Sequence, residues 1–139
     1  MLTRVLLVLV LVTGLAAGVL AEDAKIVAIG LADHEVTQVE LEKSEPLVAP
    51  RFNTGGIAYV LAADLKQGDT VEISLNLGDK SLLHNTQELS QDQPSLLLQA
   101  GKRGVPAGGW PEGTYHAEAK IMRGGKPLIC ETSTPIAFD

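Results

Sequence analysis

Three histidines are the first residues in this sequence that could do chemistry, because neutral imidazole is the commonest protein ligand of metal ions. His34, His84 and His116 are separated by about fifty and about thirty residues, so they do not form the short ligand pair that identifies a metal site. His116 and Met122 share the polar face of one expected strand and both suit Cu(I), but they are too far apart for chelation by that strand alone. The sequence predicts no metal or other cofactor, and a periplasmic metal-binding protein is kept as an alternative.

Nucleophilic catalysis would need a serine or a cysteine supported by a base and a third group. Neither the single cysteine, Cys130, nor any serine stands in a recognisable signature. The carboxylate pairs, Glu40 with Glu42 and Glu22 with Asp23, are typical of the solvated faces of an acidic protein. We therefore assign no catalytic residue, and the sequence favours a function other than that of an enzyme.

The strongest candidate for a binding surface is a glycine-rich loop, residues 101–113. It contains the only tryptophan, Trp110, and the basic pair Lys102 and Arg103, which could meet an acidic partner. Trp110 has two interpretations: an aromatic anchor at an interface, or a cap on the end of the core beside Tyr115.

A second loop, residues 50–56, carries Arg51 and Phe52 ahead of two glycines. If both loops lie at the same end of the domain, they form one composite binding site. The candidate binding residues are Trp110, Lys102, Arg103, Arg51 and Phe52.

These loops need a scaffold, and the rest of the chain predicts one made of strands. Short apolar alternations are broken about every eight to twelve residues by Gly, Pro, Asn and Asp, a spacing typical of a β-sandwich or a barrel. The clearest strand is expected over residues 70–77, where apolar and polar residues alternate. Residues 57–65 are apolar on both faces, as in a central strand that is covered on both sides.

Further strands are expected over residues 24–30, 36–42, 81–84, 95–99 and 115–122, and a last one is interrupted by Pro135. A total of about seven or eight strands predicts an all-β fold, a two-layer antiparallel sandwich. Residues 78–94 have the weakest pattern, so the topology of that part stays open.

The last hairpin is expected to turn at Gly124 and Gly125, because a tight primed turn needs positive φ at both central residues. With a two-residue turn, Ile121 faces Leu128 and Ala119 faces Cys130. Cys130 is then expected to point into the core, which opposes reactivity.

Residues 110–115, Trp-Pro-Glu-Gly-Thr-Tyr, stand just ahead of this hairpin. In immunoglobulin-like sandwiches a tyrosine near the start of the next-to-last strand closes a corner by hydrogen-bonding back to the preceding loop. With Gly113, Tyr115, the glycine-turned hairpin and the final Pro135 to Phe138, this end of the chain resembles bacterial secreted immunoglobulin-like domains. The resemblance implies an immunoglobulin-like sandwich with Gly113 and Tyr115 as its structural corner. The antibody-type cysteine pair is absent from the sequence.

Two tripeptides, Asn53-Thr54-Gly55 and Gly108-Gly109-Trp110, are similar to parts of the loops of immunoglobulin-like inhibitors of cysteine proteases. This second resemblance implies an alternative function, a protease inhibitor that acts through its glycine-rich loops.

The N-terminus has the pattern of a secretory signal peptide, because the short basic start ending at Arg4 is followed by the uncharged residues 5–20. We expect a signal helix over residues 1–21, cleavage after Ala21, and one domain over residues 22–139. An uncleaved N-terminal anchor is the alternative. No cysteine stands near the cleavage point, so lipid attachment there is not expected.

The net charge of −6 and the dispersed basic residues disfavour nucleic acid and anionic lipid as partners. A single cysteine permits no internal disulfide. The sequence thus predicts a non-catalytic, exported accessory or interaction domain of a bacterium, periplasmic or secreted. Its partner is expected to be another extracytoplasmic protein, and no membrane contact is expected after cleavage.

Overall fold

The computed structural model describes residues 23–139, so the predicted signal peptide and its cleavage site lie outside the described residues. The described part consists of strands and one short helix. The strands are β2 (Lys25–Ala32), β3 (Gly56–Leu65), β4 (Thr70–Leu77), β5 (Lys80–Glu88), β6 (Gln93–Lys102), β7 (Thr114–Arg123), β8 (Lys126–Thr132) and β9 (Ile136–Ala137), and the helix is α2 (Gln38–Glu42).

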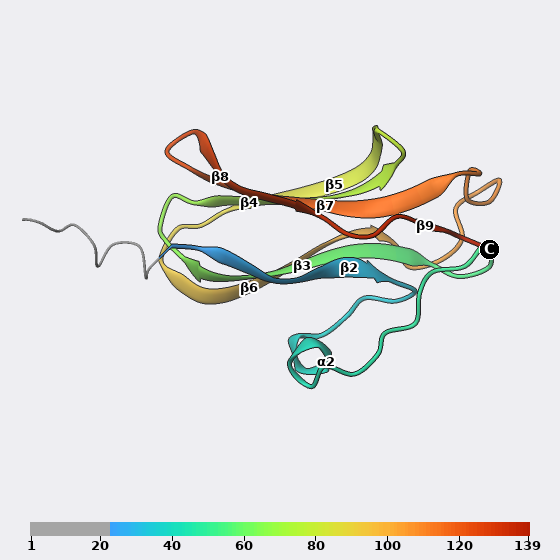
Figure 1. Ribbon diagram of the computed structural model, residues 1–139, viewed down its shortest axis with the longest axis horizontal. Helices are drawn as coiled ribbons and strands as arrows, with labels where there is room; N and C mark the ends of the chain where they lie inside the picture. The colour runs from blue at the N-terminus through green and yellow to red at the C-terminus, as the bar shows by residue number, and fades with distance from the viewer. Residues whose placement is uncertain (1–22) are drawn as a thin grey trace, which may run out of the picture.

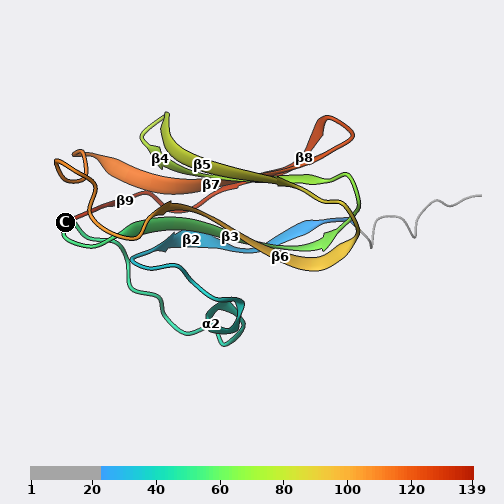
Figure 2. The same cartoon turned by 180° about the vertical axis from the view of Figure 1, so that it is seen from behind.

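The strands form two antiparallel sheets that pack as a sandwich. One sheet has three strands in the order β2-β3-β6, and the other has five, in the order β5-β4-β7-β8 with β9 paired to β7. The sheets lie one above the other, with loops gathered at both ends and α2 beyond the three-stranded sheet (Figure 1). The view from behind shows the same two layers (Figure 2). The predicted all-β, two-layer antiparallel sandwich of about eight strands is confirmed.

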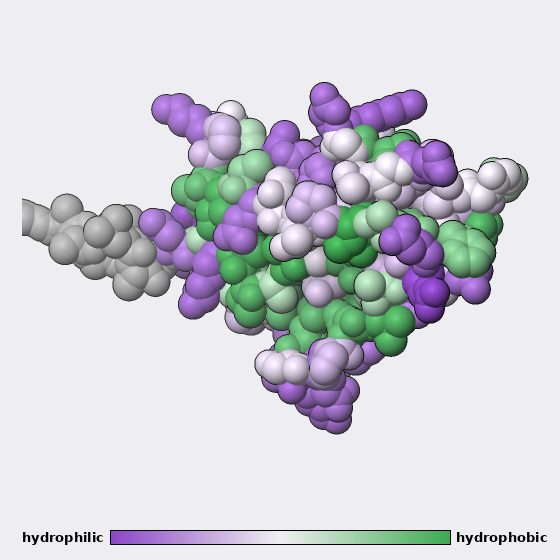
Figure 3. Space-filling model, turned by 45° about the vertical axis from the view of Figure 1, so that its right-hand side comes forward, coloured by the Kyte–Doolittle hydropathy of each residue, from purple (hydrophilic) through white to green (hydrophobic). Residues whose placement is uncertain are grey.

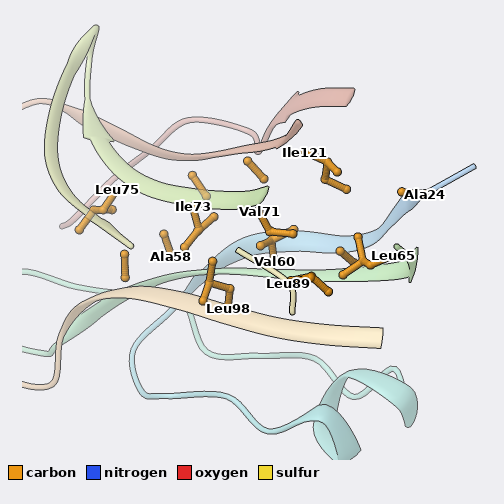
Figure 4. Close-up of a cluster of buried hydrophobic side chains, with 14 of the residues drawn as sticks. Ala24, Ala58, Val60, Leu65, Val71, Ile73, Leu75, Leu89, Leu98 and Ile121 are labelled. Carbon is orange, nitrogen blue, oxygen red and sulfur yellow. The ribbon is translucent and has the colours of Figure 1, made fainter. Parts of the chain in front are cut away.

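The main core lies between the layers and is built from alternating residues, as period two requires. On β4 the inward side chains Val71, Ile73 and Leu75 have no exposed surface, and they face Val60 and its neighbours on β3. Figure 4 shows these side chains pointing toward one another between the two sheets. The expected strand over residues 70–77 is therefore present, with its expected inward face.

The other face of β3 is also buried, as its apolar sequence indicates. Tyr59 on that face packs with Ala32 and Val36 in a second apolar cluster, against which Leu41 and Leu47 also pack. Figure 1 shows the segment around α2 lying outside the three-stranded sheet, where it covers this face. β3 is thus the central strand that the sequence predicts.

The prediction of a strand over residues 36–42 is wrong, because this segment contains the helix α2. Thr37 is the N-cap: its side chain accepts a hydrogen bond from the main-chain N–H of Glu40, while the Glu40 carboxylate accepts one from the N–H of Thr37. This reciprocal capping box stabilises a helix start, and it outweighs an alternation that spans only seven residues. The helix leaves Val39 56% exposed, whereas Val36 is buried.

The last hairpin has the expected turn but not the expected register. Gly124 and Gly125 have φ values of 61° and 77°, as a primed turn requires. A bulge follows, so that Ile121 pairs with Ile129 and Lys120 with Cys130. The prediction that Cys130 faces the core is therefore wrong, because one extra residue in a strand moves the following side chains to the opposite face.

Cys130 instead lies exposed on the outer face of the five-stranded sheet. Its Sγ atom is 3.7 Å from a carboxylate oxygen of Glu118. Partial burial and this neighbouring carboxylate raise the pKa of the Cys130 thiol, which keeps it in its less nucleophilic form.

Residues 78–94, whose topology the sequence left open, contain the hairpin between β4 and β5 and the start of β6. Among the described strands, β5 pairs only with β4 and is an edge strand of the five-stranded sheet. Most of its residues are exposed, which explains the weak apolar pattern. At the other end of the chain, residues 133–135 separate β8 from β9, so the expected interruption at Pro135 is present.

Candidate functional site

The two loops singled out in the sequence lie at the same end of the sandwich. The indole Nε1 of Trp110 donates a hydrogen bond of 2.9 Å to the main-chain oxygen of Thr54. The strands that lead into these loops also meet there, since Gly56 at the start of β3 pairs with Lys102 at the end of β6. The C-terminal segment reaches the same end, where Arg51 Nε donates to the main-chain oxygen of Asp139 at 3.1 Å. We call this end, with residues 50–56, 103–114 and 137–139, the loop end; its chain path is seen beside the C label in Figure 1.

Trp110 is half-buried and covers this end of the core. Its ring meets Tyr115 edge-on with centroids 5.8 Å apart, and it meets Phe138 edge-on at 5.1 Å. Tyr115 and Phe138 stack at 4.0 Å. These contacts correspond to the cap interpretation of Trp110, so a change at this residue would disturb the core as well as any binding surface.

The corner expected at Gly113 and Tyr115 is also present in this segment. The Tyr115 hydroxyl donates a hydrogen bond to the main-chain oxygen of Pro111, and the Tyr115 side chain has no exposed surface. Burial raises the pKa of Tyr115, so the hydroxyl keeps its proton as a donor. Gly113 has φ of 137°, and a Cβ atom there would lie 2.7 Å from a methyl carbon of Leu77. Glycine is therefore required at the corner.

Phe52 is the exposed aromatic side chain of the loop end. The main-chain N–H of Arg51 donates to Oγ1 of Thr54 at 2.9 Å, and the N–H of Thr54 donates to the main-chain oxygen of Arg51 at 3.2 Å. These bonds close a tight turn that leaves Phe52 60% exposed. An exposed aromatic ring held on an ordered turn is the kind of residue that becomes buried when a partner binds.

A hollow of about 490 Å³ lies beside Phe52. Its walls come from both loops and from the C-terminal segment. The lining residues are Phe52, Trp110, Pro111, Glu112, Gly113, Thr114, Ala137, Phe138 and Asp139.

The basic residues suggested by the sequence do not line this hollow. Lys102 and Arg103 are exposed at the end of β6, and Arg103 Nε lies 3.2 Å from a carboxylate oxygen of Glu35. Arg51 is not among the lining residues either, and its guanidinium donates to the main-chain oxygen of Asp139. The structure thus gathers Trp110 and Phe52 at one hollow and leaves Lys102 and Arg103 outside its lining.

Within residues 23–139 no group of three or more His, Cys, Asp or Glu side chains is placed to hold a metal ion. His34 Nδ1 is 2.7 Å from a carboxylate oxygen of Asp33, and its Nε2 is 2.9 Å from one of Glu40. These hydrogen bonds, with Asp33 first and Glu40 second, raise the pKa of His34. His34 therefore supports the start of α2.

Two further hollows are not predicted by the sequence. One, of about 170 Å³, lies on the outer face of the five-stranded sheet; it is lined by Glu72, Ser74, Ser81, His84, Glu118 and Lys120. Its signal in the sequence was the polar half of each alternation in β4 and β7. The other, of about 420 Å³, lies between β2 and the segment around α2 and includes Leu31, Leu47 and Tyr59. It was hidden because that segment was expected to be a strand.

The surface around these sites is mixed. Figure 3 shows patches of hydrophobic side chains, in green, among hydrophilic ones on the face that it presents. Large apolar side chains that are more than half exposed include Val27 on β2, Val39 on α2, Val48 and Phe52. Only Phe52 among these lines the hollow at the loop end. In the described part of the chain, no helix is both long and apolar enough to pass through a membrane.

No protein-family model matches the chain, and a search of curated proteins found no match to it. The fold and the geometry of the loop end are therefore the basis for its function.

Proposed function

We propose that this chain is a non-catalytic, exported interaction domain that docks on another extracytoplasmic protein through the loop end. The observation that carries this proposal is the placement of Phe52. Its ring is 60% exposed, it stands on a hydrogen-bonded turn, and it borders the hollow that both loops form. Exposed aromatic residues beside a hollow are typical of the energetically dominant parts of protein interfaces.

The export that this proposal includes is supported by the sequence of residues 1–21, with its basic start and uncharged stretch. The full chain expressed in a bacterium should be found in the periplasm or the medium, shortened by cleavage after Ala21. Recovery of the intact chain in the cytoplasm would contradict export.

The finer fold that we propose is an immunoglobulin-like sandwich. Its support is the hydrogen bond from the Tyr115 hydroxyl to the main-chain oxygen of Pro111, just ahead of the last long hairpin. This is the corner that such sandwiches use at the start of their next-to-last strand.

Docking is tested with the full chain as bait in an extract of extracytoplasmic proteins, with two matched variants. Phe52→Ala removes the exposed ring at the loop end, and Val39→Ala removes a side chain of similar exposure, 56%, on α2. We expect a captured protein to be lost with Phe52→Ala and kept with Val39→Ala, while both variants melt like the parent. Equal capture by both variants would remove the loop end as the docking site.

A second candidate function is inhibition of papain-like cysteine proteases. It is favoured by one contact: the hydrogen bond from Trp110 to Thr54 joins the two tripeptides, residues 53–55 and 108–110, whose sequences resemble inhibitor loops. Asn53→Ala should weaken inhibition if those loops enter a protease cleft. Gly55 is a poor probe, because a Cβ atom there would collide with the main-chain oxygen of Arg103. Absence of inhibition across a panel of such proteases would end this candidate.

A further inference from the structure

The hollow at the loop end has an unusual combination of side chains. Aromatic rings form part of its wall, through Phe52 and Trp110, and its only ionisable lining residues among residues 23–139 are the acids Glu112 and Asp139. No lysine, arginine or histidine of the described part of the chain lines it. The hollow is therefore apolar on one side and negatively charged on the other.

The side chains of the two acids, Glu112 and Asp139, form no ion pair within the described part of the chain. Arg51 contacts this segment, and its Nε atom donates to the main-chain oxygen of Asp139 rather than to either carboxylate side chain. Both carboxylate side chains can thus contact a ligand, with Arg51 held by the main chain beside Asp139.

The aromatic rings and carboxylates of the hollow favour a positively charged ligand. A cation is attracted to the face of an aromatic ring as well as to a carboxylate, whereas an anion is repelled by both. The planar guanidinium group can stack on a ring and donate hydrogen bonds to a carboxylate at the same time. The net charge of −6 of the whole chain also favours the approach of a basic partner.

We propose that the hollow at the loop end receives a basic side chain, an arginine or lysine, of the protein partner. Phe52 supplies the ring against which the cation packs, and Glu112 and Asp139 supply the opposite charge. This inference rests on the proposed docking function, and it reverses the sequence-based expectation that Lys102 and Arg103 meet an acidic partner.

The test uses the full chain and the fluorescence of Trp110, the only tryptophan, as a reporter inside the hollow. The probes are capped peptides of equal length with alternating glycine and either arginine, glutamate or glutamine. We expect the arginine peptide to change the fluorescence saturably and the other two to leave it unchanged. The effect should weaken as salt rises, because the hollow is open to solvent and its charges are screened.

Matched variants locate the binding. Glu112→Gln, Asp139→Asn and Phe52→Ala should each weaken the arginine peptide about two- to five-fold, as expected for a partly exposed ion pair or cation–π contact. Glu88→Gln, which removes the same charge from an exposed residue at the far end of β5, should leave binding unchanged. Binding of the glutamate peptide, no binding of the arginine peptide, or an equal effect of Glu88→Gln would overturn the inference.

Two results distinguish a failure of this inference from a failure of the proposed docking function. If the captured partner is lost with Phe52→Ala but kept with both Glu112→Gln and Asp139→Asn, docking at the loop end is supported. The inference that the hollow receives a basic side chain is then wrong. If the arginine peptide binds as expected but no partner depends on Phe52, the hollow binds cations and the docking function is wrong.

Discussion

The two sheets of this sandwich have outer faces of opposite character. On the three-stranded sheet, the outer face of β3 carries Ile57, Tyr59 and Leu61, all buried. On the five-stranded sheet, the outer face of β4 and β7 carries polar residues such as Glu72 and Lys120, which pair across the strands. An apolar face must be removed from water to stabilise the fold, whereas a polar face needs no cover. The chain between β2 and β3 provides that cover.

Several hydrogen bonds attach the covering segment to the sheet. The side-chain amide of Gln99 on β6 accepts from the N–H of Val36 at 2.8 Å and donates to the main-chain oxygen of the same residue at 3.0 Å. Gln38 on α2 donates to Ser95 Oγ at 3.0 Å. The outer face of the three-stranded sheet, which we call the covered face, thus depends on specific contacts over a long sequence separation. Its residues should be more sensitive to substitution than those on the outer face of the five-stranded sheet, which we call the open face.

The largest effect is expected from Tyr59→Ala, which removes the main side chain of the covered face. Loss of a buried aromatic ring should lower the free energy of unfolding by about 3 to 5 kcal/mol, as measured by urea denaturation. Tyr59→Phe keeps the ring and should cost less than about 1.5 kcal/mol. The Tyr59 hydroxyl lies against β2, since a Cβ atom on Gly30 would be 2.6 Å from it. A similar loss for both variants would show that this hydroxyl is the essential part of the side chain.

Gln99→Ala is expected to have the next largest effect, because it leaves the buried main chain of Val36 without its partners. The free energy of unfolding should fall by about 1 to 3 kcal/mol, the usual cost of unsatisfied buried polar groups. Gln87→Ala, at an exposed position of β5, is the control and should change it by less than about 0.5 kcal/mol. Equal losses of unfolding free energy in the two variants would mean that Gln99 does not hold the segment around α2 on the sheet.

Thr37→Ala removes the N-cap of α2 and should cost about 1 kcal/mol. Thr37→Ser keeps the hydroxyl acceptor and should restore most of that loss. Amide hydrogen exchange in residues 38–42 is the measurement, and unchanged exchange in Thr37→Ala would show that packing alone maintains the helix.

A smaller, pH-dependent effect is expected from His34, whose pKa is raised by Asp33 and Glu40. A raised pKa in the folded state stabilises the protein fully below about pH 6.5, and this contribution is lost as pH rises through the folded pKa. The side chain is 44% exposed, so solvent screens the effect. The difference in unfolding free energy between the parent and His34→Gln should therefore be larger at pH 6 than at pH 9. A difference that grows toward pH 9 would contradict this assignment.

The smallest effect is expected on the open face, at Asn76. Its Oδ1 atom is buried without a hydrogen-bond partner among the described residues, although its Nδ2 donates to Glu118 at 3.2 Å. Asn76→Val removes the unsatisfied oxygen together with that bond and introduces a side chain suited to strands, so the unfolding free energy should change by less than about 0.5 kcal/mol. A loss as large as that of Gln99→Ala would show that the open face is as constrained as the covered one.

The strands of the sheets and the segment that covers β3 also differ in how far the sequence predicts them. The strands over residues 70–77 and 57–65 are predictable because period two, or an apolar character on both faces, is visible over a complete strand. The alternation does not predict the helix α2, although both members of its capping box, Thr37 and Glu40, stand in the sequence. Apolar residues in a seven-residue segment are compatible with either period, and the decision depends on how the segment packs against Tyr59.

The candidate site was predicted in part for a similar reason. The sequence indicates both loops and all five candidate binding residues, but it gives their grouping into one composite site only on the condition that the loops lie at the same end. Trp110 and Phe52 share one hollow, whereas Lys102 and Arg103 lie outside its lining. The acids Glu112 and Asp139, which determine the charge of that hollow, are far apart in the sequence and had no signal of their own.

By itself, the sequence determined the sandwich class, the glycine turn at residues 124–125 and the corner at Tyr115, because alternation, positive φ and a nearby hydrogen bond are local properties. Only the tertiary structure decided the outward side of Cys130, the covering of β3 and the meeting of the loops around Trp110. A bulge, a cap on a sheet and the approach of two loops depend on strand register and on long-range packing, and residues distant in the sequence determine both.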